Sequence, residues 1–329
     1  MKLAGLCVLA WVLITGCVPL TYPPGEKNAP AHLAKGMYIT EDGVHLPVRQ
    51  WLPDGDVQAV VIALHGFNDY SHFFQQPGDY LKTQGIASFA YDQRGFGLAP
   101  QRRLWAGLGA YTADVNQLVA LLKQRYPNRP LYLLGESMGA AVIMAAMSQT
   151  PKPEVAGIIL SSPALWARST MPWYQSGLLW LLAHSVPWLS LTGEGVKVTP
   201  SDNIPMLRAL GKDPLVIKGS RVETLYGLTD LMDVAYASAP LLNGNSLLLY
   251  GERDDIIPKP PTYAFLQRFL AQQRSQKTVA FYQHGYHLLL RDLQAKSVWQ
   301  DIVAWIRQPT NALPSGAGLR AGQVLQTLQ

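Results

Sequence analysis

Residues Gly135–Gly139 read Gly-Glu-Ser-Met-Gly and place Ser137 two positions from a glycine on either side, after an apolar run and before an alanine-rich stretch. This order predicts a strand at Leu131–Leu134, a sharp turn, and a helix that continues to about Ser148. Such a turn tolerates only very small flanking residues and leaves the serine hydroxyl exposed at the end of the strand. The placement predicts a nucleophile at Ser137; the alternative is an idle serine in a glycine-rich turn.

A serine hydroxyl is a weak nucleophile at neutral pH, so it needs a base, and the base needs a carboxylate that orients it. A serine on such a turn is followed along the chain by the acid and then by the histidine. Asp254 ends a G-x-x-D pattern just after the predicted strand Ser246–Tyr250, and we expect it to be the acid. Glu252 and Asp255 are the competing carboxylates.

Of the seven histidines, His284 and His287 lie downstream of the predicted acid. His287 follows the predicted strand Thr278–Tyr282 by a short loop and directly precedes three leucines, so we expect it to be the base. His284 is then a surface loop residue. Two earlier residues are expected to shape loops: His65 holds its own loop, and Arg94 pairs with a carboxylate.

The segments that must position these residues alternate between apolar runs and helical stretches, the pattern of a mostly parallel sheet covered on both faces. Strands are predicted at 37–40, 44–51, 57–64, 86–91, 131–134, 155–160, 246–250 and 278–282. Helices besides the one after the serine are predicted near 73–84, 111–125, 262–273 and 289–306. The sequence therefore predicts an α/β core made of residues 37–163 and 241–308.

The alternation stops between residues 164 and 240. This stretch is rich in tryptophan and leucine and is divided by prolines, so short helices are predicted there. An insertion of this size can form a lid over a site in the core. Residues 309–329 are expected to be a loose C-terminal tail.

The first residues are typical of an export signal. One lysine precedes the apolar run Leu3–Ile14, which is shorter than the roughly 20 residues of a membrane-spanning helix, so residues 1–16 are predicted to be a signal peptide. The run ends in Ile14-Thr15-Gly16-Cys17, which resembles the bacterial lipobox. The resemblance implies cleavage before Cys17 and a lipid on its thiol; the alternative is an ordinary signal peptide with a chance cysteine.

A lipid on Cys17 would place the protein in a bacterial cell envelope, and Val18 favours the outer membrane, facing the periplasm. Residues 17–36 contain several prolines and are expected to be a lipidated tether that lets the body stand away from the membrane. Cys7 and Cys17 are the two cysteines, so the mature chain would contain no disulfide.

The 329 residues are 48% hydrophobic and 15% charged, which excludes a disordered, charge-dominated chain. The net charge of +5 is spread along the chain without a basic and aromatic patch, so no nucleic-acid partner is predicted. The histidines are scattered without a metal-ligand spacing, and no metal or cofactor is predicted. Nothing in the sequence sets the oligomeric state.

Taken together, the motifs resemble the α/β-hydrolases of the monoacylglycerol lipase and lysophospholipase group, which is also grouped with the serine aminopeptidases. The motifs are His65-Gly66-Phe67-Asn68, Asp92-x-Arg94-Gly95-x-Gly97, Gly135-Glu136-Ser137-Met138-Gly139, Gly251-x-x-Asp254 and Tyr286-His287-x-Leu289-Leu290-x-Asp292. The resemblance spans about residues 36–307 and implies a Ser137–Asp254–His287 triad under an inserted helical cap. It also implies an oxyanion hole formed by the backbone N–H groups of Phe67 and Met138.

The resemblance implies a serine hydrolase of carboxylic esters. The apolar, tryptophan-rich insertion favours a small amphiphilic ester, monoacylglycerol or lysophospholipid, over a sugar or a peptide. An aminopeptidase or thioesterase that uses the same residues is the alternative activity. A non-catalytic envelope scaffold is the alternative without chemistry.

Overall fold

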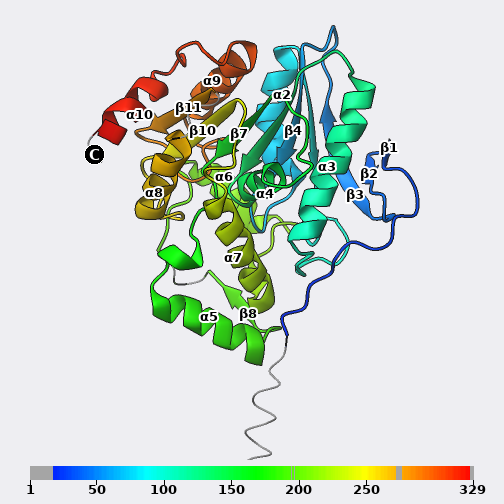
Figure 1. Ribbon diagram of the computed structural model, residues 1–329, viewed down its shortest axis with the longest axis vertical. Coiled ribbons are helices and arrows are strands. Elements are labelled where there is room, and N and C mark those ends of the chain that lie inside the picture. The colour runs from blue at the N-terminus through cyan, green and yellow to red at the C-terminus, as the bar shows by residue number, and fades with distance from the viewer. Residues whose placement is uncertain (1–17, 194, 196, 272–275, 327–329) are drawn as a thin grey trace, which may run out of the picture.

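The computed structural model describes residues 18–193, 195, 197–271 and 276–326, and Figure 1 shows their arrangement. Within these residues nine strands form one sheet in the order β1-β2-β3-β5-β4-β6-β7-β10-β11. From β5 to β11 in this order all neighbours are parallel, whereas β1, β2 and β3 join the edge of the sheet as antiparallel strands. The bounds are β1 His32–Ala34, β2 Met37–Ile39, β3 His45–Trp51, β4 Ala59–Leu64, β5 Ile86–Tyr91, β6 Leu131–Glu136, β7 Gly157–Ser161, β10 Ser246–Gly251 and β11 Lys277–Tyr282.

Helices cover both faces of this sheet (Figure 1). Along β4 the side chains of Val60 and Ile62 belong to one buried apolar cluster, and those of Val61 and Ala63 to a second. Helices α3, α4 and α8 contribute to the first cluster, and α2 and α9 to the second. Their bounds are α2 Gln75–Thr83, α3 Leu108–Arg125, α4 Met138–Met147, α8 Lys259–Leu270 and α9 Ala295–Arg307. Strands covered on both faces are apolar almost throughout, and the predicted α/β architecture is confirmed.

The predicted insertion, residues 164–240, is a separate layer at one end of the sheet, which we call the cap (Figure 1). Its elements are η2 Arg168–Thr170, α5 Trp173–Ser185, β8 Ser190–Thr192, α6 Ile204–Lys212, β9 Gly219–Arg221 and α7 Val222–Ala237. Short helices between prolines were expected, and α5 and α6 match this expectation. The two-stranded ribbon β8–β9 was not expected, because strands of three residues carry no alternating pattern.

The segment after Cys17 is not the free-standing tether that the sequence predicts. Residues 1–17, with the predicted signal peptide and Cys17, lie outside the described residues. From residue 18 onward the chain runs along the body: the Leu20 N–H donates to Glu223 Oε2 of α7, and the Tyr22 N–H donates to the Trp105 carbonyl. The segment then enters the sheet as β1. Its backbone is held by the body because these N–H groups find acceptors there.

The expectation of a loose C-terminal tail is also wrong. Residues Ala317–Gln326 form a helix, α10, that packs beside β11 (Figure 1). Ala317 and Ala321 are buried, and the Arg320 guanidinium pairs with Glu252 at 2.7 Å. Among the residues that the structure describes, no helix combines the length and the apolarity needed to cross a bilayer.

Candidate active site

The Ser137 turn joins the end of β6 to the start of α4. Ser137 has a φ of 54° and a ψ of −112°, a conformation that is strained for a residue with a side chain. Its N–H donates to the Ser161 carbonyl at 2.9 Å, and its own carbonyl accepts from the N–H of Ala141 and of Ala164. The turn is therefore held by β7, by α4 and by the first residue of the cap.

Glycines 135 and 139 are required by close approaches of backbone to backbone. A Cβ atom on Gly135 would lie 2.3 Å from the Ala140 nitrogen, and one on Gly139 would lie 2.2 Å from the Leu64 carbonyl oxygen. Neither neighbour can give way, because both are main-chain atoms of packed elements. The expectation that only very small residues fit on either side of Ser137 agrees with this packing.

Asp254 and His287 meet at the same edge of the sheet. Asp254 follows β10 and His287 follows β11, and His287 Nδ1 lies 2.8 Å from Asp254 Oδ2. The other oxygen of Asp254 accepts from the N–H groups of Ile256 and Ile257, which fixes the carboxylate. Both side chains are buried. Burial alone would lower the pKa of His287, but the carboxylate of Asp254 raises it above its usual value.

The competing residues have other partners. Glu252 pairs with Arg320 of α10, and Asp255 accepts from the Thr199 N–H of the cap. His284 is exposed and lies against the Arg253 guanidinium. The structure thus pairs Asp254 with His287, whereas Glu252, Asp255 and His284 are bound to other groups.

The loop after β4 lies beside the Ser137 turn. A Cβ atom on Gly66 would lie 3.4 Å from Ser137 Cβ, an ordinary van der Waals contact. Met138 is the first residue of α4, where helical N–H groups have no partner within the helix. Within the described part of the chain, no protein acceptor takes the N–H of Phe67 or of Met138. Both amides remain able to donate to a ligand.

His65 and Arg94 lie where the sequence expected them, in structural roles. His65 is fully buried; its Nε2 accepts from the Gln93 N–H at 2.9 Å, and its Nδ1 lies 2.8 Å from the Gly66 carbonyl. This pairing specifies the neutral ring, and burial lowers the pKa of His65 in the same direction. Arg94 pairs with Asp42 and Asp114, away from Ser137.

A buried ion cluster, which sequence reasoning missed, connects three loops of the site. Arg291, four residues after His287, donates to Glu136 Oε1 and to Asp69 Oδ2, each at 2.7 Å. Glu136 precedes the serine and is fully buried, and burial raises its pKa although Arg291 opposes this. The available signal was a carboxylate inside an apolar strand and turn, since a buried carboxylate needs a cation.

A segment of the cap, Thr199–Asn203, is bound to the loops that carry both Asp254 and His287; we call it the strap. Ser201 Oγ donates to Asp292 Oδ1 at 2.6 Å, and Asp292 Oδ2 accepts from the N–H of Tyr286, the neighbour of His287. The remaining bonds of the strap are Thr199 N–H to Asp255, Leu288 N–H to the Pro200 carbonyl, Leu293 N–H to Asp202 and Asn203 Nδ2 to the Arg291 carbonyl. The imidazole loop is therefore positioned by the cap as well as by the core.

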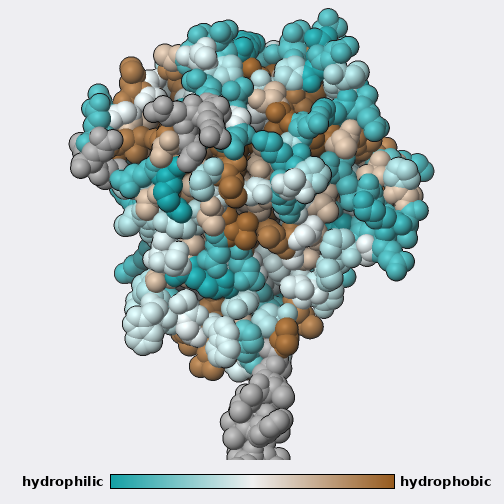
Figure 2. Space-filling view, viewed as in Figure 1, coloured by the Kyte–Doolittle hydropathy of each residue, from teal (hydrophilic) through white to brown (hydrophobic). Residues whose placement is uncertain are grey.

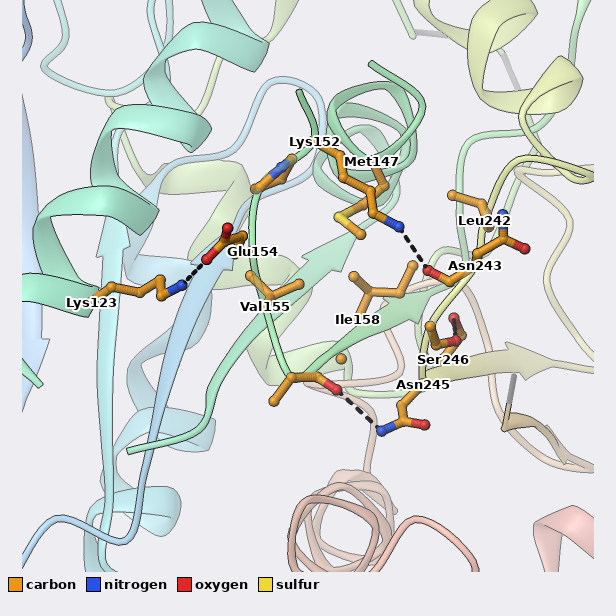
Figure 3. Close-up of a pocket in the computed structure, with 14 residues that line it drawn as sticks. Lys123, Met147, Lys152, Glu154, Val155, Ile158, Leu242, Asn243, Asn245 and Ser246 are labelled. Carbon is orange, nitrogen blue, oxygen red and sulfur yellow. Dashed lines mark hydrogen bonds and ion pairs between the residues drawn. The ribbon is translucent and has the colours of Figure 1, made fainter. Parts of the chain in front are cut away.

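Two cavities lie at different distances from the sheet edge that carries Ser137, Asp254 and His287. One of about 220 Å³ lies between the segment Asp69–Gln76 and α6, with Arg291 at its wall, and so adjoins the ion cluster. Another, of about 450 Å³, is shown in Figure 3 and is lined by residues that precede or begin β7 and β10, such as Val155 and Asn245. It therefore lies at the end of the sheet opposite to Ser137.

A family model described as serine aminopeptidase, S33, matches residues 55–294. The chain belongs to this hydrolase family. The monoglyceride lipase of Homo sapiens is 26% identical over 283 residues, which cover 83% of this chain and 90% of that protein. The monoacylglycerol lipase of Mycolicibacterium smegmatis is 26% identical and covers 80% of this chain and 93% of its own length.

The crystal structure of the monoacylglycerol lipase of Paleococcus ferrophilus matches with a TM-score of 0.66 at 22% identity, covering 79% of this chain and 98% of that one. This likeness shows that the fold is the α/β-hydrolase fold, as predicted. The chain is thus a lipase- or esterase-like serine hydrolase, and the resemblance to the monoacylglycerol lipase group is confirmed.

Replacing Ser201 by alanine is expected to slow turnover while leaving substrate affinity nearly unchanged. The change removes the hydroxyl that holds Asp292 and, through Tyr286, the imidazole loop. We expect kcat to fall by about tenfold and KM to stay within about twofold, because catalysis depends steeply on geometry. The measurement is steady-state hydrolysis of a soluble ester. Ser185→Ala, which removes an exposed cap hydroxyl bonded to Leu181, is the control; unchanged kcat in Ser201→Ala contradicts the prediction.

Proposed function

We propose that the protein hydrolyses carboxylic esters through an acyl-enzyme formed on Ser137. The observation that carries the proposal is the buried 2.8 Å contact between His287 Nδ1 and Asp254 Oδ2, at the sheet edge where the Ser137 turn stands. This contact keeps the proton of the neutral imidazole on Nδ1, so Nε2 is the nitrogen left to accept a proton. Ser137, Asp254 and His287 follow one another along the chain in the order that nucleophile, acid and base take in this fold, which supports the proposal.

In the proposed reaction, His287 Nε2 takes the proton of Ser137 as the serine oxygen attacks the ester carbonyl carbon. The carbonyl oxygen becomes an oxyanion that accepts from the N–H groups of Phe67 and Met138. His287 then passes the proton to the leaving alcohol, and the acyl group stays on the serine. Water, deprotonated by the same imidazole, attacks the acyl carbon; the bond from this carbon to the serine oxygen breaks, the imidazolium returns its proton to Ser137, and the carboxylic acid is released. No cofactor enters these steps.

We propose a small amphiphilic ester, a monoacylglycerol or lysophospholipid, as substrate. Support comes from the cap, where several large apolar side chains of α5 are more than half exposed, among them Trp173 by 84% and Trp180 by 54%. Figure 2 shows pale and brown atoms at the lower end of the molecule, where Figure 1 places α5 and β8. A soluble sugar or peptide would not need such a surface on the cap. The relatives named above as monoacylglycerol lipases also support it.

Aminopeptidase activity is the second candidate because of the description of the family. A peptidase of this kind needs carboxylates in the cap that hold the substrate amine. Asp230 and Asp233 both pair with Arg168, and Glu223 pairs with Arg221 and accepts from the Leu20 N–H. Glu194 lies outside the described residues. The described carboxylates of α7 are thus engaged, which favours the ester over the peptide.

Ser137→Ala is expected to lower the rate of hydrolysis of monoacylglycerol, lysophosphatidylcholine and short aryl esters by at least about 10³-fold, while the protein stays folded. The parent is expected to cleave these esters faster than an aminoacyl amide, measured by product release in parallel assays. A fluorophosphonate probe should label the parent and not the variant. Ser176→Ala, on the exposed side of α5, is the control and should keep full activity. If product is released faster from the amide than from the esters, the aminopeptidase alternative is favoured. If the probe does not label the parent, the alternative of a non-catalytic scaffold is favoured.

Asp254→Asn is expected to move the acid limb of the pH–rate profile to lower pH. In the parent, kcat/KM falls as the pH drops through the raised pKa of His287, because only the neutral imidazole accepts a proton. The variant loses the charge that raises this pKa and keeps the burial that lowers it. The plateau should also fall by about 10³- to 10⁴-fold, because the tautomer is no longer fixed. Asp255→Asn is the control and should leave the midpoint in place; a midpoint that rises in Asp254→Asn contradicts the assignment.

We propose further that the chain is anchored in the bacterial envelope by a lipid on Cys17, in the outer membrane and facing the periplasm. Support comes from the sequence before Cys17 and from the place where the first described residues run. The Leu20 N–H donates to Glu223 of the cap, and Figure 1 shows the first described residues beside β8 and one end of α5, so a lipid attached just upstream would be joined to the chain at the cap. The exposed apolar side chains of the cap would then face the lipid.

Cys17→Ser is expected to abolish incorporation of a radiolabelled fatty acid and to release the protein from the membrane fraction after cell breakage. Cys7→Ser removes the other thiol and should change neither, because Cys7 would leave with the signal peptide. Fatty-acid labelling that persists in Cys17→Ser would contradict the anchor.

A further inference from the structure

The cap exposes an apolar surface that other described residues leave largely uncovered; we call it the cap face. Helix α5 contributes one buried residue, Ala183, although most of its side chains are apolar. The members of the cap face are 40–84% exposed: Trp173, Tyr174, Leu178, Trp180, Leu181, Trp188, Leu189 and Leu191. Large exposed patches of this kind mark an interaction site. Aromatic rings with a polar edge favour the boundary between lipid and water.

The N-terminal segment lies at this same face. Val18 and Leu20 are 76% and 54% exposed, and the backbone of Leu20 is bonded to Glu223 at the start of α7. Figure 1 shows this dark blue segment beside β8 and one end of α5. The next residue upstream, Cys17, is the proposed site of the lipid anchor. The chain therefore enters the body at the cap face, which identifies lipid as the occupant that this face fits.

A hollow of about 480 Å³ adjoins the ribbon β8–β9, and its lining is cationic. The charged residues among the described residues that line it are Arg102, Arg103, Lys212, Lys218 and Asp213. We call it the cationic hollow. Arg103 donates to Ser190 Oγ and to the Gly219 carbonyl, which attaches the hollow to both strands of the ribbon. Ser190 and Thr192 line the hollow, and Leu191 of the cap face lies between them on β8 with its side chain on the opposite face of the ribbon, so β8 is the border between the hollow and the cap face.

The charge of the cationic hollow is not balanced by the protein. Asp213 is its one carboxylate among the described lining residues, and this group already accepts from the Tyr70 hydroxyl and the Leu215 N–H. Burial and the nearby guanidinium of Arg102 lower the pKa of Lys218, although Asp213 opposes this. Four cations around one occupied carboxylate suit an anion with several acceptor oxygens, such as a phosphodiester.

We propose that the cap face and the cationic hollow together dock the protein on an anionic phospholipid bilayer, with a lipid phosphate in the hollow and the rings of α5 at the lipid–water boundary. Neither group suffices alone: the apolar face does not distinguish between lipids, and the hollow does not bring the body to a surface. The two groups border each other along β8, so a bilayer that contacts this border would meet the apolar side chains on one side of it and the cations on the other. The proposal rests on the proposed membrane association but not on ester hydrolysis.

The test uses the full, lipid-anchored protein in vesicles whose acyl chains are brominated, with quenching of tryptophan fluorescence as the readout. The anchor holds the protein on every vesicle, so quenching reports whether the cap is docked. We expect stronger quenching in vesicles with 30% phosphatidylglycerol than in pure phosphatidylcholine, and a loss of this difference at high salt. Equal quenching in both vesicles would overturn the proposal, and so would quenching that salt does not change.

The decisive variants differ in where they remove charge. Arg102→Gln with Lys212→Gln takes two charges from the hollow, and Lys123→Gln with Lys152→Gln takes two from the cavity at the opposite end of the sheet (Figure 3). Each basic residue near an anionic surface contributes about fivefold to association, so the first pair should lower the docking constant by about 25-fold and the second hardly at all. Equal losses in both pairs would show an effect of net charge alone and overturn the proposal.

Two controls distinguish a loss of docking from misfolding and from binding of phosphate alone. Both double variants should hydrolyse a soluble short-chain ester at the parental rate, which shows that they are folded; a protein without any hydrolytic activity can still be scored for docking. Inorganic phosphate added at constant ionic strength should compete with the phosphatidylglycerol effect. Phosphate that binds the hollow without reducing the quenching would overturn the assignment to a lipid phosphate.

Discussion

One buried guanidinium joins the parts of the site. Arg291 contacts Glu136, which belongs to the serine turn, and Asp69, which belongs to the loop after β4, while its own loop carries His287. Two carboxylates and one cation share this interior position, so removal of the cation would leave two buried carboxylates without a counter-charge. The contacts of Arg291 thus link the three loops to one another. The strained conformation of Ser137 is maintained because its surroundings determine it from several sides.

The cap is part of this arrangement. Its strap, Thr199–Asn203, is bonded to the loops of Asp254 and His287, and the carbonyl of Ser137 accepts from Ala164 at the start of the cap. The cap therefore contacts both sides of the site. A lid that merely covered a pocket would need no bonds to the loops beneath it. These bonds couple the position of the strap to that of the loop that carries the imidazole.

Features that depend on residues close together in the chain could be predicted from the sequence. The Ser137 turn is encoded in five residues, and the order of strands along the chain places Asp254 and His287 at the same edge. Features that join distant segments could not be predicted. Ser201 and Asp292 are 91 residues apart, and a serine in a loop carries no signal of a carboxylate partner. The N-terminal segment and α10 were misread because proline- and glycine-containing ends indicate flexibility only when nothing packs against them.

The two ends of the sheet differ in how their cations are paired with carboxylates, and this difference follows from the fold. At the end where the strands begin, Lys123 pairs with Glu154, whereas Lys152 donates to the Asn243 carbonyl, so one of the two lysines that line the cavity in Figure 3 has a carboxylate partner among the described residues. At the cap, carboxylates are used within the protein: those of α7 hold arginines and the N-terminal segment, and Asp213 holds Tyr70. The cations of the cationic hollow are left without a carboxylate of their own. In a chain with a net charge of only +5, it is this local pairing, and not the overall charge, that makes one end of the molecule attractive to an anionic surface.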